Sequence, residues 1–198
     1  MDTTPDHSNR IASLLGRIFH PYFISILTVL IILSNLSLSE ALRWSALVLI
    51  LVLVPGILLI MYLRRQDRQI YQRKTRTPVY LVVLVSVLIC VGVLHILNAP
   101  DVLIACIATL AIWLPVQLLV NTFVTKISTH VAVIAGCSTA LWYLGKLDKP
   151  ILALALLVAI LITMWSRITT KNHTYLQVML GLIVGAGSVL VAFPLLLG

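Results

Sequence analysis

Charge is scarce in this chain, and acidic charge is the scarcest. Of its 198 residues, 10% are charged, six are Asp or Glu, and 61% are hydrophobic. Soluble domains carry about 25% charged residues and about 45–50% apolar residues. The composition therefore excludes an ordinary soluble domain and indicates an integral membrane protein. Because the apolar runs are continuous and do not alternate with polar residues, helices are expected to span the membrane.

The apolar runs contain almost no ionisable side chains. Ion pumps and secondary transporters need such groups at membrane depth, so neither class fits. Cysteine is also rare: Cys90, Cys106 and Cys137 lie inside apolar runs without metal-ligand spacing, and we expect them to be small core residues. We expect no metal and no cofactor. The basic residues flank the apolar runs with few aromatic residues among them, which argues against a nucleic-acid partner.

Apolar runs with short polar breaks predict an all-α fold, a polytopic transmembrane helix bundle of about seven spans. The spans take up most of the chain, so residues 1–198 are expected to form a single integral membrane domain without a separate soluble part. The predicted spans are 20–37, 42–63, 78–98, 101–123, 127–145, 150–166 and 173–196.

The predicted spans place most basic residues on one face of the membrane. A chain that crosses at each span puts every Lys and Arg on the N-terminal face except Arg43, Lys146 and Lys149. The positive-inside rule then makes the N-terminal face cytoplasmic and puts the C-terminus on the opposite side. The expected location is the cell membrane of a bacterium or an archaeon.

Three polar clusters lie on that same face, each at the mouth of a span. They are RKTRTP at 73–78, KISTH at 126–130 and SRITTKNH at 166–173. A phosphate-ester site needs cations for the phosphoryl oxygens, a nucleophile, and a proton donor for the leaving oxygen. The arginines of these clusters can supply the cations, and His130 and His173 can supply the other two roles.

Several of the same residue types also have a plainer interpretation. An arginine or a histidine at the end of a span is commonly an anchor at the headgroup level. His20, in the segment FHPYF, and His95 are interpreted in this way and are given no chemical role. Gly181 and Gly185 are four residues apart in the last span, and this spacing predicts a close helix-packing contact.

The segment SRITTKNHTYLQ, residues 166–177, resembles the third signature of the type 2 phosphatidic acid phosphatase superfamily. That signature is Ser-Arg, five residues, His, three residues and Asp. Arg167 and His173 keep the spacing, and Gln177 stands where the family usually has Asp. The resemblance covers roughly residues 64–190, and the first two predicted spans add nothing to it.

The other two clusters resemble the remaining signatures of the same superfamily. KISTH is similar to Pro-Ser-Gly-His: it keeps Ser128 and His130 and has Ile127 and Thr129 at the other two positions. RKTRTP resembles the first signature, a basic residue followed by Arg-Pro, loosely, because a threonine separates the arginine from the proline.

The resemblance implies a six-helix phosphatase-like core that hydrolyses a lipid phosphate through a phosphohistidine without a metal. It makes His173 the nucleophile that attacks phosphorus. It makes His130 the acid that protonates the leaving oxygen and later activates water. The implied phosphate-binding residues are Arg167, Ser128, Arg76, Arg73 and Lys126, with Arg68 as a further candidate.

Gln177 is the main departure from the family pattern. The family's Asp accepts a hydrogen bond from the second ring nitrogen of the nucleophilic histidine. Because His173 and Gln177 are four residues apart, they share a helix face, and the Gln177 amide oxygen is expected to accept that bond. The amide brings no negative charge, and this predicts a slower reaction.

Two classes of function follow from the sequence. The first is a membrane phosphatase whose substrate is a polyprenyl phosphate or diphosphate, or a phosphatidic-acid-type lipid; the apolar sequence does not separate these substrates. The second is a weak or inactive relative that binds anionic lipids or a protein partner through the basic loop at 64–78. Phosphate release in the presence of a chelator separates the two classes.

Overall fold

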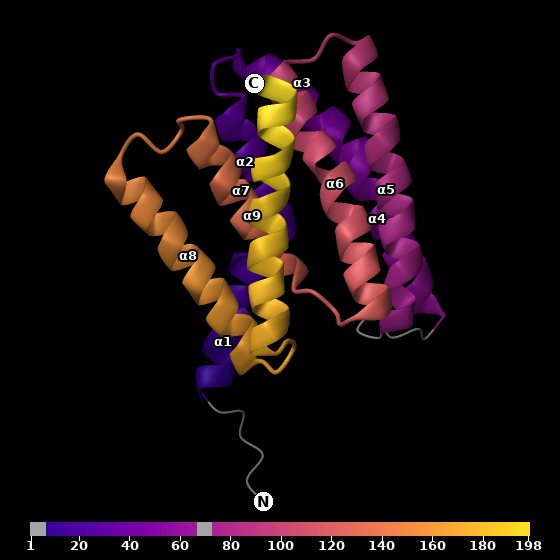
Figure 1. Ribbon diagram of the computed structural model, residues 1–198, viewed down its shortest axis with the longest axis vertical. Helices are drawn as coiled ribbons and strands as arrows, with labels where there is room; N and C mark the ends of the chain where they lie inside the picture. The colour runs from indigo at the N-terminus through magenta and orange to yellow at the C-terminus, as the bar shows by residue number, and fades with distance from the viewer. Residues whose placement is uncertain (1–6, 67–72) are drawn as a thin grey trace, which may run out of the picture. The chain divides into compact units, whose positions relative to one another are not determined.

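The computed structural model describes residues 7–66 and 73–198, and the regular structure in these ranges is entirely helical (Figure 1). This confirms the predicted all-α fold. The elements are α1 (His7–Ile18), α2 (Pro21–Ile32), α3 (Leu38–Val48), the π-helical turn η1 (Leu49–Leu53), α4 (Val54–Arg65), α5 (Arg73–Ile96), α6 (Asp101–Phe123), α7 (Thr129–Tyr143), α8 (Pro150–Thr169) and α9 (Tyr175–Leu197).

By length and composition, six helical segments within residues 7–66 and 73–198 can cross a bilayer, as expected for an integral membrane protein. The fifth predicted span, 127–145, corresponds to α7, which has 15 residues and is shorter than the about 20 residues that a spanning helix needs. The long segments are His7–Ile32, Leu38–Arg65, Thr77–Ile96, Asp101–Phe123, Pro150–Thr169 and Tyr175–Leu197.

The first two predicted spans have different boundaries in the structure. The first helical segment begins at His7 and ends at Ile32, whereas the sequence predicts 20–37. The next begins at Leu38, four residues before the predicted start, because Ser37 and Glu40 form a capping box. The Glu40 N–H donates to Ser37 Oγ (3.3 Å), and the Ser37 N–H donates to Glu40 Oε2 (3.1 Å).

The helices form two compact units, which are described separately. The second unit comprises Val29–Lys126 and Ser188–Gly198. In it, α5 and α6 lie side by side (Figure 1), and the buried Gln117 side chain donates from Nε2 to the Tyr80 hydroxyl at 3.1 Å. Helix α4 packs closely on α5 at Gly56, where a Cβ would lie 2.9 Å from a Val83 methyl group.

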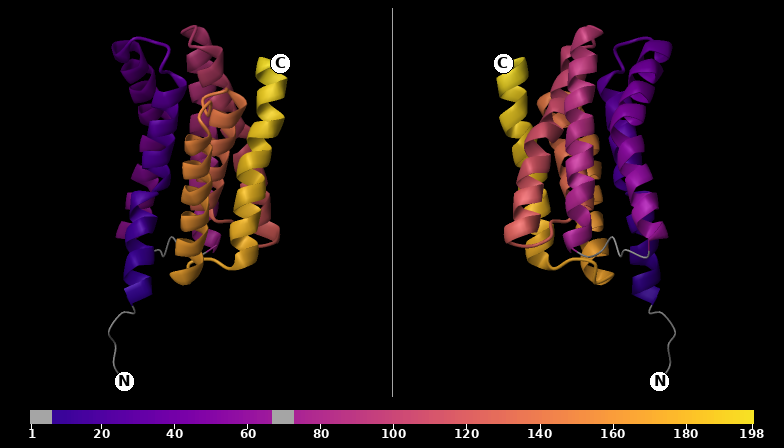
Figure 2. Two further views of the ribbon diagram at one scale, coloured as in Figure 1. Left: turned by 90° about the vertical axis from the view of Figure 1, so that its left-hand side faces the viewer. Right: turned by 90° about the vertical axis from the view of Figure 1, so that its right-hand side faces the viewer.

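The first unit comprises the residues up to Thr28 together with Ile127–Gly187. Helix α8 packs against α1 and α7 in this unit. Figure 2 shows α8 and α9 as successive helices joined by a short turn. All the contacts of the candidate site described below lie inside this unit.

Two glycines set the distance between α7 and α9. A Cβ on Gly181 would lie 2.7 Å from the Ser128 carbonyl oxygen, and a Cβ on Gly185 would overlap the Ala132 carbonyl group. These approaches confirm the predicted packing contact, since only a hydrogen atom fits between the two backbones. Gly187, two residues further on, is not part of the contact, because a Cβ there would meet no atom within 4 Å.

Candidate active site

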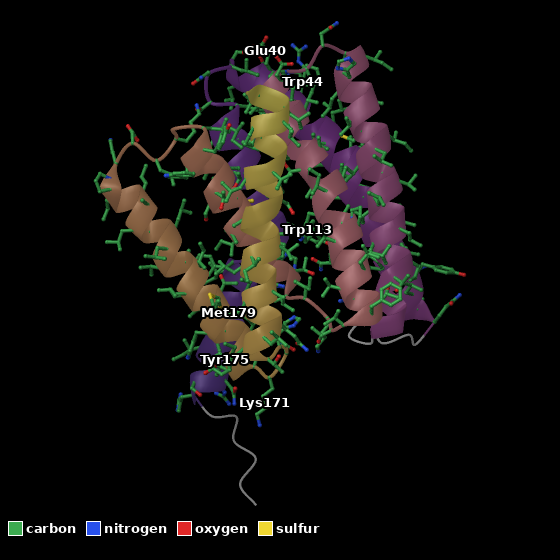
Figure 3. All side chains as sticks on the ribbon, in the orientation of Figure 1. Glu40, Trp44, Trp113, Lys171, Tyr175 and Met179 are labelled. Carbon is green, nitrogen blue, oxygen red and sulfur yellow. The ribbon has the colours of Figure 1, made fainter. Side chains whose placement is uncertain are left out.

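The turn between α8 and α9 ties Arg167 to His173 through the backbone. Lys171 has a left-handed conformation (φ 54°) and ends α8. The chain then folds back, and the His173 N–H donates to the Arg167 carbonyl oxygen at 3.1 Å. Figure 3 labels Lys171 and Tyr175 on the two sides of this turn. Arg167 and His173 are therefore the two ends of one turn that joins α8 to α9 and is closed by a backbone hydrogen bond.

A second capping box starts α9 directly after His173. The Gln177 N–H faces Thr174 Oγ1 (3.4 Å), and the Thr174 N–H donates to Gln177 Oε1 (3.3 Å). The same Gln177 oxygen lies 3.1 Å from His173 Nδ1. The predicted contact between the histidine ring and the glutamine amide is thus present, and Gln177 also has a structural role that the signature does not indicate.

These contacts assign the tautomer of His173. Because Gln177 Oε1 accepts from a backbone N–H, the atom beside the ring is the amide oxygen and can only accept. His173 Nδ1 must therefore carry the proton. In the neutral ring, Nε2 is then the unprotonated nitrogen and carries the lone pair that a nucleophile needs.

Ser128 is held against the start of α9. Its N–H donates to the Gln177 carbonyl oxygen at 3.1 Å, and Ser128 is the residue before the first turn of α7. The side chain is fully buried, yet its hydroxyl oxygen has no hydrogen-bond partner among the described residues. A buried hydroxyl without a partner is costly, so this group is suited to bind an oxygen atom of a ligand.

Arg167 lies against α1, a helix outside the region of the family resemblance. Its Nη2 donates to Ser166 Oγ at 3.2 Å, and the buried Ser166 hydroxyl donates to the Ala12 carbonyl oxygen at 2.6 Å. A Cβ on Gly16 would overlap the Arg167 guanidinium. The absence of a side chain at Gly16 therefore makes the space that the guanidinium occupies.

His130, in the first turn of α7, is in contact with a second imidazole. The rings of His20 and His130 have centroids 5.4 Å apart and an interplanar angle of 78°, an edge-to-face arrangement. Arg167 lies close enough to His20 to act on it electrostatically. His20 therefore lies beside both Arg167 and His130, a proximity that the headgroup-level interpretation did not indicate.

The predicted site residues differ in how far the structure describes them. Arg167, Ser128, His130, His173 and Gln177 belong to one unit and are connected by the contacts above. Lys126 is half-buried and belongs to the second unit. Arg68 lies outside the described residues, as do the side chains of Arg73 and Arg76, whose backbone opens α5.

Three residues of the site were missed because they lie outside the signatures. Ala12, Gly16 and His20 are spaced four residues apart in the sequence. This spacing is typical of residues on one helix face and was the available signal that this segment contributes to the candidate site. Ala12 and Gly16 precede the first predicted span, 20–37, and His20 is its first residue. The capping role of Gln177 was also missed, and its signal was the sequence TYLQ at 174–177 before an apolar run.

Comparisons of the chain with protein-family models, curated proteins and solved structures gave no match. Within residues 7–66 and 73–198, no three His, Cys, Asp or Glu side chains gather as a metal site. The candidate site contains two imidazoles, a guanidinium and a buried hydroxyl. These groups can bind an anionic oxygen-rich group and transfer protons to and from it.

Proposed function

We propose that this protein is a membrane-embedded lipid phosphate phosphatase that works through a phosphohistidine. The observation that carries the proposal is the contact between His173 Nδ1 and Gln177 Oε1, because it leaves Nε2 with a lone pair at the end of a turn that also holds Arg167. The substrate is a phosphate ester or diphosphate of a membrane lipid. Both polyprenyl and phosphatidic-acid-type lipids fit this chemistry.

In the first step, His173 Nε2 attacks phosphorus, and the bond between phosphorus and the leaving oxygen breaks. His130 in its protonated form gives its proton to that oxygen, so that the lipid alcohol, or lipid monophosphate, leaves as a stable species. Arg167 and Ser128 bind the phosphoryl oxygens while charge shifts across them. Phosphoryl transfer depends mainly on such positioning and charge stabilisation.

In the second step, His130 is neutral and accepts a proton from a water molecule. The water oxygen attacks phosphorus, the bond to His173 Nε2 breaks, and inorganic phosphate leaves. The Gln177 oxygen keeps the ring of His173 in one orientation throughout, because it accepts the hydrogen bond from Nδ1–H in both steps. It stabilises the positively charged ring less than a carboxylate does, which is why a slow enzyme is expected.

A second candidate function is the binding of anionic lipid without hydrolysis. One observation favours it: the Gln177 oxygen also accepts the Thr174 N–H, so helix capping alone accounts for the residue. Arg167 and the Ser128 hydroxyl would then bind a headgroup phosphate, and no bond would be broken.

Phosphate release from a short-chain lipid phosphate, measured in detergent with EDTA, distinguishes the two functions. The enzyme releases phosphate under these conditions, and His173→Ala reduces the rate by about 10³-fold or more, as expected when a nucleophile is removed. His95→Ala is a matched control, because His95 is an exposed histidine at the end of α5. No release from either lipid class, with lipid still bound, would support the binding function.

Vanadate provides an independent test of the phosphoryl pocket. A pentacoordinate oxyanion bound by Arg167 and Ser128 resembles the transition state, so vanadate should inhibit the wild-type protein. Arg167→Lys should weaken this inhibition, because a lysine cannot replace a guanidinium that forms two directed bonds. Activity that is undiminished by vanadate would contradict this arrangement.

The proposed location is a bacterial or archaeal cell membrane, with the site near the cytoplasmic surface. This orientation counts the shorter α7 as a crossing helix. With seven crossings most Lys and Arg lie on the face of the site, and this excess supports the orientation. Reporter fusions after Gly198 and within the loop at 67–72 should then report opposite sides of the membrane, with the loop in the cytoplasm. A cytoplasmic reading at Gly198 would contradict it.

A further inference from the structure

His20 lies at a break between two helices. Helix α1 ends at Ile18 and α2 begins at Pro21, which has no N–H to continue the helical bonds. The Tyr22 N–H lies 3.4 Å from His20 Nδ1, and the Ile24 N–H donates to the His20 carbonyl oxygen at 3.2 Å. These bonds fix the ring of His20 relative to the backbone of α2.

The ring of His130 needs such a fixed neighbour. The last side-chain torsion of a histidine is broad, so the rotamer alone does not set the ring plane. An edge-to-face contact places the positive edge of one ring against the negative face of the other and thereby favours one plane. His20 provides this contact to His130, with the ring centroids 5.4 Å apart.

The position of His20 is itself anchored to the site. Ala12 and Gly16 lie one turn apart on α1, and His20 follows four residues later, just beyond the end of α1. The Ala12 carbonyl oxygen accepts the Ser166 hydroxyl, and Gly16 faces the Arg167 guanidinium. The contacts of α1 with Ser166 and Arg167 therefore also determine where His20 meets His130.

We infer that His20 is a positioning residue that holds the imidazole of His130 in the plane required for proton transfer to the leaving oxygen. The inference rests on the proposed function, in which His130 is the acid for that oxygen. His20 lies outside the three polar clusters, and its ring contact with a residue of those clusters is with His130. Its removal should therefore impair only reactions that need the acid.

The dependence on the leaving group tests this role. An alkyl alcohol is a poor leaving group and needs a proton, whereas nitrophenolate is a weak base and leaves without one. His20→Ala should lower kcat for octyl phosphate by about tenfold or more, a part of the about 10²–10⁴-fold that a general acid contributes. For an octyl-substituted nitrophenyl phosphate, kcat should fall by less than about twofold, and KM should change little for either substrate.

Two further variants separate ring positioning from a role in packing. His20→Gln has no ring and should show the same selective loss as His20→Ala. His20→Phe keeps an aromatic ring for the edge-to-face contact and should retain most activity on both substrates. In a His130→Ala background, His20→Ala should have no additional effect on the alkyl substrate, because residues that act as a unit are not additive.

The outcomes separate this inference from the proposed function. Wild-type protein that hydrolyses neither phosphate would contradict the proposed function and this inference with it. Active wild-type protein with equal losses on both substrates in His20→Ala and His20→Gln would contradict the inference alone, since a packing role would produce that result. An unchanged kcat for octyl phosphate in both variants would also contradict it.

Discussion

The two polar segments of the candidate site are held in different ways. In residues 166–177, local contacts fix the geometry: the His173 N–H meets the Arg167 carbonyl, and Gln177 closes onto Thr174 and the His173 ring. In residues 127–130, contacts with other helices fix it. The Ser128 N–H bonds to α9, and His130 meets a ring from the α1–α2 junction.

Local contacts thus hold His173, the proposed nucleophile. Contacts with other helices hold Ser128 and His130, the groups proposed to assist it. The backbone of the segment with His173 is a closed turn with its own caps, whereas the side chains of Ser166 and Arg167 also contact α1. The segment with Ser128 and His130 is placed by helix packing, in particular by the glycines of α9. Substitutions in the helix contacts should therefore displace Ser128 and His130 and leave the His173 turn in place.

The largest effect is expected at the contact between α7 and α9. Gly185→Val would place side-chain atoms on the Ala132 carbonyl group, and the backbone there cannot move without separating the two helices. We expect loss of most phosphatase activity and a decrease of about 1–3 kcal/mol in stability. Phosphate release and thermal unfolding in detergent measure the two effects.

Gly187→Val is the matched control for that substitution. Gly187 is on the same helix, and a Cβ there would have no atom within 4 Å. Its activity and unfolding temperature should stay close to those of the wild-type protein. Equal behaviour of the two valine variants would show that the glycine contact does not position Ser128 and His130.

A smaller effect is expected where α1 meets Arg167. Gly16→Ala would displace the guanidinium, which is the flexible end of a side chain, and would also place a Cβ 2.8 Å from the buried Ser166 Oγ. Loss of a charged hydrogen bond to the substrate should raise KM by about tenfold. Gly92→Ala, at a helix position without neighbours within 4 Å, is the control. An unchanged KM in Gly16→Ala would mean that Arg167 does not bind the substrate in this position.

The smallest effect is expected from a change inside the local turn. Gln177→Glu preserves the capping box and the contact with His173 Nδ1, and it adds the negative charge that the family pattern has at this position. The kcat for lipid phosphate should rise by about threefold or more. Gln177→Ala removes both contacts and should lower kcat. A glutamate variant as slow as the alanine variant would contradict the role given to the His173–Gln177 contact.

The local parts of the molecule could be predicted from the sequence. The apolar runs indicated the helical segments, and the four-residue spacing of His173 and Gln177 indicated their contact. The Gly181–Gly185 pair indicated a packing contact, although the spacing did not identify the partner helix. These features depend on neighbours within one or two helical turns, where periodicity carries the information.

The non-local parts could not be predicted in the same way. His20 is separated from His130 by more than a hundred positions in the sequence, and a histidine at the end of a span looks the same whether it faces a headgroup or another imidazole. The absence of a side chain at Gly16 matters only because the Arg167 guanidinium of α8 occupies the space beside it. Helix α7 is short at its C-terminal end because Gly145, with φ 64°, ends the helix there.

Trapping of the covalent intermediate tests the central proposal most directly. Wild-type protein is mixed with a lipid phosphate labelled at phosphorus, denatured in base within a turnover, and analysed for label on the chain. A phosphohistidine survives base and is lost in acid, so the proposal predicts base-stable, acid-labile label at His173 that is absent from His173→Ala. Phosphate release by wild-type protein without such label, or label that persists in His173→Ala, would contradict it.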